Sequence, residues 1–212
     1  MGHTGTCGAA LDEERRFELA VTGGGFRTDL TFDGTHQHLE EASAALAFTY
    51  RPSALSFQVS AGAVLAGSIT GPLGDFDLKP GFLASASVGY TILDGDGPRP
   101  YLAVSGTVSA SIAPTRSRSS LADSPDLTAT DLRASVVLGK RLFGVWLPYV
   151  GAAVFGGPVW FAPGGQSRTG SDVHHYRLTT GSSFSLPGHL EAFVEVGFLG
   201  EQAVVGGLGW AF

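Results

Sequence analysis

Large apolar residues alternate with small or polar residues along most of the chain. Between residues 42 and 50, for example, Leu46, Phe48 and Tyr50 share one parity, and small or polar residues separate them. A period of two places alternate side chains on opposite faces of a β-strand. The alternation predicts ten strands, which cover residues 17–22, 42–50, 55–65, 82–92, 102–112, 132–139, 147–161, 176–186, 190–198 and 203–212. Within 147–161 both parities are apolar, so the pattern assigns no inward face there.

The two faces of these strands differ in a way that favours a membrane over water. One face of nearly every strand is built from Ser, Thr, Gly and Ala, and the other carries large apolar side chains with almost no charge at the strand centres. A soluble β-barrel or sandwich, which is the alternative, points its large apolar residues inward and exposes charge. The pattern therefore predicts an all-β fold, an antiparallel up-and-down transmembrane β-barrel of ten strands.

The connections between the predicted strands alternate in length. Short turns at 51–53 and 187–188 alternate with longer segments, which we predict to be external loops, at 28–38, 68–79, 114–127 and 162–173. With the terminal aromatic Phe212, this arrangement resembles the bacterial outer-membrane β-barrel proteins over residues 15–212. The resemblance implies the outer membrane of a Gram-negative bacterium, both chain ends in the periplasm, and outer-membrane lipids and lipopolysaccharide as partners.

Aromatic residues at the external ends of the predicted strands are expected to form an interfacial belt. Its predicted members are Trp160, Phe161, Tyr176 and Phe198.

Composition excludes several other classes of protein. Hydrophobic residues make up 43% of the chain, yet Ser, Thr and Gly interrupt every apolar run well short of the length of a transmembrane helix. The net charge of -6 argues against a nucleic-acid partner. The histidine pairs lack a further set of ligands at diagnostic spacing, so we expect neither a metal site nor a cofactor.

The first residues differ from the rest of the chain. Residues 1–14 are predicted to be a flexible periplasmic segment, and the barrel is predicted to occupy 15–212. This N-terminus has no apolar core of the kind found in signal peptides, so we infer that a signal peptide has been removed. Cys7 is the single cysteine, which excludes an intramolecular disulfide and leaves either a lipidation site or an unmodified thiol.

Several charged residues have the parity of the inward, small-residue face. They are Glu18, Glu41, Arg133, Arg177, Glu191 and Glu195. Charges in a narrow interior should pair, because an isolated desolvated charge is costly. Two non-enzymatic functions follow: a plugged barrel that acts as a structural or adhesion scaffold, and a narrow channel for small solutes lined by Ser, Thr and Gly.

Two predicted external loops contain a pair of polar residues spaced two apart. The second loop has Asp75 and Asp77, and the fourth has Asp172 and His174. Residues two apart on a strand share a face, so each pair could point to the barrel mouth, where His174 would act as a base and Asp172 would orient it. These four residues resemble the catalytic motifs of the omptin outer-membrane proteases. That resemblance implies an alternative function, a surface hydrolase.

Overall fold

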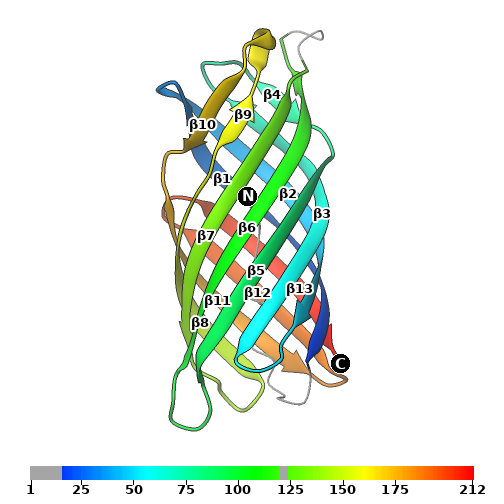
Figure 1. The fold of residues 1–212 in the computed structure, drawn as a ribbon, viewed down its shortest axis with the longest axis vertical. Coiled ribbons are helices and arrows are strands. Elements are labelled where there is room, and N and C mark those ends of the chain that lie inside the picture. Colours follow the sequence, from blue (N-terminus) through cyan, green and yellow to red (C-terminus); the bar gives the residue numbers. More distant parts are fainter. Residues whose placement is uncertain (1–15, 120–123) are drawn as a thin grey trace.

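A closed sheet of antiparallel strands makes up the computed structural model, which describes residues 16–119 and 124–212 (Figure 1). The described residues contain no helix of the length and hydrophobicity needed to cross a membrane. The predicted N-terminal segment 1–14, with Cys7, lies outside the described residues. The elements are β1 (Phe17–Phe32), β2 (Thr35–Tyr50), β3 (Leu55–Thr70), β4 (Phe76–Leu78), β5 (Gly81–Asp94), β6 (Tyr101–Ser117), β7 (Asp126–Gly139), β8 (Trp146–Gly156), β9 (Val159–Phe161), the short 3-10 turn η1 (Pro163–Gly165), β10 (Arg168–Asp172), β11 (Tyr176–Leu186), β12 (Leu190–Phe198) and β13 (Gln202–Ala211).

Ten of the described strands form a complete ring at the end of the barrel that holds the C-terminus. Its order is β1, β2, β3, β5, β6, β7, β8, β11, β12 and β13, and pairing of β13 with β1 closes it. We call this part the wide section. The antiparallel barrel and its ten strands agree with the prediction from the sequence.

The opposite end of the barrel is built from fewer strands. There β4 lies between β3 and β6, β9 pairs with β7, and β10 pairs with both β9 and β1. The strands β11, β12 and β13 stop below this level, so the described ring contains eight strands: β1, β2, β3, β4, β6, β7, β9 and β10. We call this part the narrow section, because a barrel with fewer strands has a smaller diameter. Figure 1 shows β9 and β10 at this end, far from the C-terminus.

The narrow section corrects the prediction of four long external loops. Residues 28–32 and 35–38 continue β1 and β2 to a two-residue turn at Asp33 and Gly34, and parts of the other three segments also form strands. The strands are consequently longer than a bilayer crossing requires. Backbone groups in these segments pair with neighbouring strands, which satisfies their hydrogen bonds.

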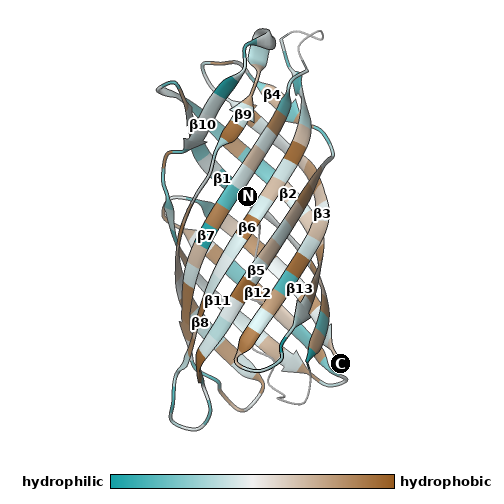
Figure 2. Ribbon diagram, in the orientation of Figure 1, coloured by the Kyte–Doolittle hydropathy of each residue, from teal (hydrophilic) through white to brown (hydrophobic). Residues whose placement is uncertain are grey.

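The apolar face of the strands reverses between the two sections. Brown and pale residues alternate along β5, β6 and β7 in Figure 2. In the wide section the large apolar side chains face outward and are exposed, as for Leu19, Val21, Leu46, Val59, Val108, Leu132, Val194 and Leu208. In the narrow section they face inward and are buried, as for Leu30, Phe32, Leu39, Ile69, Phe76, Leu127, Val159 and Phe161. Charged side chains, including Arg27, Glu40 and Arg118, occupy the outer face there.

A bulge in β3 produces part of this reversal. The register between β2 and β3 shifts at Ala42 and Ser43, and Leu65 has no partner. The inward residue of β3 is Val64 before the bulge and Ile69 after it, so the inward parity changes from even to odd.

The structure assigns the inward face of residues 147–161, for which the sequence pattern gave no assignment. Odd residues such as Leu147, Tyr149 and Phe155 are buried in the barrel, whereas Val150 and Val154 are exposed on its outer face. Both faces read as apolar because this part of the wall contributes hydrophobic side chains to the interior.

Candidate functional site: the barrel interior

Three phenylalanine rings meet inside the narrow section. Phe32 comes from β1, Phe76 from β4 and Phe161 from β9, which lie on different sides of the ring of strands. The ring centroids of Phe76 and Phe161 are 5.0 Å apart in an edge-to-face contact, and those of Phe32 and Phe161 are 6.1 Å apart. Each of the three side chains is at most 2% exposed. The prediction that Phe161 belongs to an outer aromatic belt is wrong, and its neighbour Trp160 faces outward instead.

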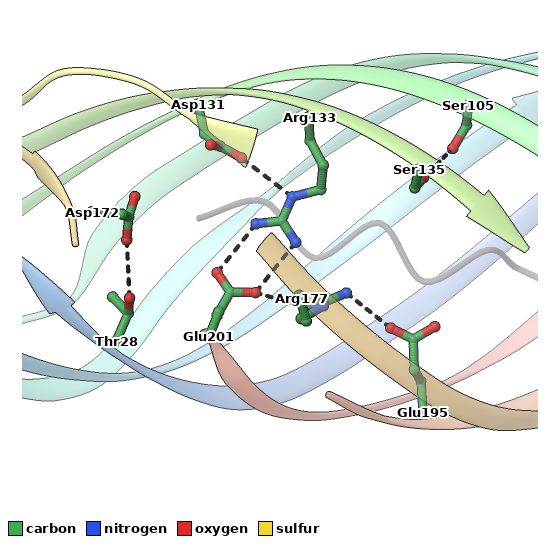
Figure 3. Close-up of polar contacts among 9 residues, drawn as sticks. All are labelled: Thr28, Ser105, Asp131, Arg133, Ser135, Asp172, Arg177, Glu195 and Glu201. Atoms are coloured by element: carbon green, nitrogen blue, oxygen red, sulfur yellow. Dashed lines mark hydrogen bonds and ion pairs between the residues drawn. The ribbon is translucent and has the colours of Figure 1, made fainter. Parts of the chain in front are cut away.

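An ionic network lies below this aromatic layer, with Glu201 at its centre (Figure 3). Arg133 donates two hydrogen bonds to the Glu201 carboxylate, at 3.2 Å and 3.1 Å, in a bidentate arrangement. Arg177 donates to the same carboxylate at 2.6 Å. Through its other terminal nitrogen, Arg177 donates to Glu195 at 2.9 Å. One carboxylate therefore holds two guanidinium groups from different strands.

Further contacts extend the network to the barrel wall. The Nε of Arg133 lies 3.3 Å from an oxygen of Asp131, and its guanidinium stacks 4.5 Å from the ring centre of Phe155. The hydroxyl of Tyr149 donates to Glu195 at 3.2 Å. All of these side chains are buried. Buried charges are tolerated only when they are paired and hydrogen-bonded, as they are here.

A third group of buried side chains lies on the inner face toward the end of the barrel that holds the C-terminus. Tyr101, Val137, Leu147 and Tyr149 form a buried cluster on the inner face. The guanidinium of Arg51 forms an ion pair with Glu18, which is completely buried. Aromatic, ionic and mixed layers thus follow one another along the interior.

The structure places all six sequence-predicted lumen residues on the inner face, where they are buried. Arg177 pairs with Glu195, and Glu18 pairs with Arg51. The buried Oε1 atoms of Glu41 and Glu18 both accept no hydrogen bond from the described residues, although Glu18 forms an ion pair through its other carboxylate oxygen.

Three charged members of these networks were not predicted from the sequence: Asp131, Glu201 and Arg51. Asp131 has the same parity as Arg133 and lies one residue before the predicted start of its strand, so a longer strand would have included it. Arg51 was assigned to the short turn at 51–53, and Glu201 lies between the predicted strands 190–198 and 203–212. Nothing in the local sequence indicates that a turn residue points into the barrel.

The four candidate hydrolase residues do not form one cleft. Asp77 lies on the outer face, where Arg118 donates two hydrogen bonds to its Oδ1, and Asp75 accepts a long hydrogen bond from the backbone of Gly71. Asp172 is buried on the inner face and accepts a hydrogen bond from Thr28 at 3.0 Å. His174 is exposed and contacts the ring of Tyr176. The expected arrangement of two pairs facing each other at the mouth is absent among these described residues.

The two candidate aspartates on regular strands also have different electrostatic environments. The hydrogen bond from Arg118 holds the pKa of Asp77 below its ordinary value. Burial raises the pKa of Asp172. Within the part of the chain that the structure describes, no three His, Cys, Asp or Glu side chains are grouped in a way that could hold a metal ion.

Comparison with known proteins identifies the fold. No protein-family model matches the chain, and no curated protein is similar to it in sequence. Among solved structures, the outer-membrane protease OmpT from Escherichia coli superposes with a TM-score of 0.55 at 9% identity, covering 93% of this chain and 97% of the protease. The translocator domain of the autotransporter NalP from Neisseria meningitidis gives a TM-score of 0.53 at 11% identity, covering 92% and 88%. The fold is that of the bacterial outer-membrane β-barrels.

Outer-membrane β-barrels of different functions resemble this chain to the same degree. An outer-membrane channel from Pseudomonas putida F1 also superposes with a TM-score of 0.53, at 10% identity, covering 93% of this chain and 96% of the channel. A protease, a translocator and a channel therefore share the architecture, and function has to be argued from the interior and the surface of this barrel.

Proposed function

We propose that the protein is a closed barrel of the bacterial outer membrane, which holds a rigid scaffold above the lipid surface and conducts no solute. In this proposal the wide section spans the bilayer, because its outer face is apolar. The narrow section stands in water outside the cell, because its outer face is charged and its apolar residues are packed inside. The plugged structural or adhesion scaffold is favoured over the small-solute channel.

The observation that carries this proposal is the contact of Phe32, Phe76 and Phe161 across the narrow section. An ion on its way through the barrel would have to separate these buried rings. It would then have to break the ion pairs that Arg133 and Arg177 make with Glu201. Both steps remove packing or hydrogen bonds that the closed interior satisfies.

A non-enzymatic function is supported by the placement of the candidate catalytic residues. Asp77 and Asp172 lie on opposite faces of the barrel wall, and each is engaged in a hydrogen bond. An omptin-like hydrolase would need its two pairs of residues to face a common substrate.

Single-channel recording in a planar lipid bilayer tests the proposal. We expect the refolded protein to insert without discrete current steps, under conditions in which a porin conducts. Insertion is verified separately, by the heat-dependent mobility of the folded barrel in electrophoresis. Reproducible current steps from the folded wild-type protein would overturn the closed-barrel function.

A further inference from the structure

An apolar hollow lies on the outer face of the wide section. Its volume is about 570 Å³, and it crosses β5, β6, β7, β8 and β11. Its outward-facing lining residues form two register-paired rows: Val88, Gly106, Ala134, Val154 and Tyr176 in the first, and Tyr90, Val104, Val136, Ala152 and Leu178 in the second. The residues between the two rows, Gly89, Ser105, Ser135, Ala153 and Arg177, complete the lining.

Side-chain size produces the hollow. Gly106, Ala134 and Ala152 form its floor on three neighbouring strands, whereas valine, leucine and tyrosine side chains rise around them. A Cβ added to Gly106 would meet no atom within 4 Å, so the space above this residue is open. The surrounding side chains, such as Tyr90 and Val154, are exposed on the outer face.

The hollow runs obliquely from one edge of the apolar belt toward the other. Its rows follow the hydrogen-bond register and therefore run across the strands, which tilt relative to the barrel axis (Figure 1). Tyr176, at one end, is the first residue of β11 and lies at the boundary with the narrow section. Tyr90, at the other end, lies near the end of β5 that faces the C-terminus. Four strand spacings separate the ends, which is about 19 Å.

We propose that this hollow binds one acyl chain of lipopolysaccharide, with the headgroup next to Tyr176. The inference rests on the proposed membrane position, in which the Tyr176 end faces the outer leaflet, where lipopolysaccharide is the lipid. A flexible hydrocarbon chain fits a long, narrow and apolar groove, and the volume is in the usual range for a small ligand. In lipid, packing of the chain against the groove supplies the affinity, because the hydrophobic effect does not distinguish groove from bilayer.

The polar residues at the outer end support the same orientation. His174 and His175 are exposed and directly precede Tyr176, whose side chain is half exposed. The phenol hydroxyl and the imidazoles offer hydrogen bonds to the phosphates and sugars of a glycolipid headgroup. The other end of the groove is bounded by Val88, Tyr90 and Val104, which offer only one hydroxyl.

Native mass spectrometry of the folded protein tests this inference. The protein is purified in mild detergent, depleted of lipid, and titrated separately with hexa-acylated lipid A and with phosphatidylethanolamine. Gly106→Leu fills the floor of the hollow without a backbone clash, and Gly23→Leu is the matched control. Gly23 faces outward on β1, away from the hollow, and an added Cβ there meets only the Ser43 carbonyl at an ordinary 3.6 Å.

We expect the wild type and Gly23→Leu to retain one lipid A molecule, and Gly106→Leu to bind it about tenfold more weakly, because packing contacts between the acyl chain and the groove are lost. Equal lipid A binding by wild type and Gly106→Leu would overturn the inference, as would stronger retention of phosphatidylethanolamine. Heat-dependent mobility identifies variants that are folded. Failure of the wild type to fold and insert would instead contradict the proposed function.

Discussion

At the scale of single residues, Glu201 supplies the negative charge that pairs with both Arg133 and Arg177 in the barrel interior. It accepts hydrogen bonds from Arg133 and Arg177, and all three side chains are almost completely buried. The turn between β12 and β13 thereby reaches β7 and β11 through the lumen. Replacing Glu201 would leave Arg133 with only Asp131 and Arg177 with only Glu195 as carboxylate partners among the described residues, and would remove one buried negative charge from the network.

We therefore expect Glu201→Ala to lower the free energy of unfolding by about 3–5 kcal/mol, as for other broken buried ion pairs. Urea-induced unfolding in lipid vesicles, followed by tryptophan fluorescence, measures the change. The control is Glu40→Ala, since Glu40 is half exposed and pairs with Arg27 on the outer face. An exposed pair is worth about 1 kcal/mol or less. Similar losses for the two variants would show that the interior network contributes no special stability.

At the scale of strands, the sequence was sufficient to predict the inward and outward faces where large apolar residues alternate strictly with small ones. The faces of β1 and β2 near Leu19 and Leu46 were predicted because the outward residues there are large and apolar, as the proposed membrane position requires. The predictions were wrong in the narrow section, where segments predicted to be loops form strands. Phe32 and Phe76 were assigned to loops, because their neighbours Asp33, Asp75 and Asp77 gave these segments the composition of exposed connections.

The break between β8 and β9 depends on one glycine. A Cβ on Gly157 would collide with the carbonyl oxygen of Thr130 on β7, and the amide of Thr130 donates to Pro158. We expect Gly157→Ala to destabilise the protein by about 1–3 kcal/mol, the usual cost of overpacking. Thermal unfolding measures the loss, and hydrogen exchange of β9 and β10 locates it. Gly106→Ala is the control, because its added Cβ meets no neighbour. Equal stability of the two alanine variants would contradict this role of Gly157.

At the scale of the whole molecule, the two sections of the barrel have different outer faces, one apolar and one charged. The wide section presents Leu132 and Val204 outward, whereas the narrow section presents Asp29 and His38 outward and buries its phenylalanines. The sequence predicted the first arrangement but not the second. The apolar residues change from the outward face to the inward face within one strand, so no single alternation continues across the boundary between the two sections. The candidate interior was only partly predictable. The alternation placed the charged residues on the inward face, but it did not show which of them pair across the barrel.

This division predicts which residues are accessible from outside the cell. In a Cys7→Ser background, we expect His38→Cys on intact cells to react with a membrane-impermeant maleimide. His38 lies on the outer face of the narrow section. Phe143→Cys should react only after the outer membrane is permeabilised, because Phe143 is 90% exposed in the turn at the opposite end. Labelling of Phe143→Cys but not His38→Cys on intact cells would reverse the proposed orientation.

The pairing of β1 has a consequence for how the protein is made. One edge of β1 pairs with β2, and its other edge is shared by β13 and β10. The first strand of the sheet must therefore wait for residues 168–172 before the narrow section can close, and for residues 202–211 before the wide section can close. Contacts so distant in sequence form slowly and expose strand edges until the last moment. Until β13 pairs with β1, the sheet therefore keeps an open edge on β1, and this pairing closes the ring.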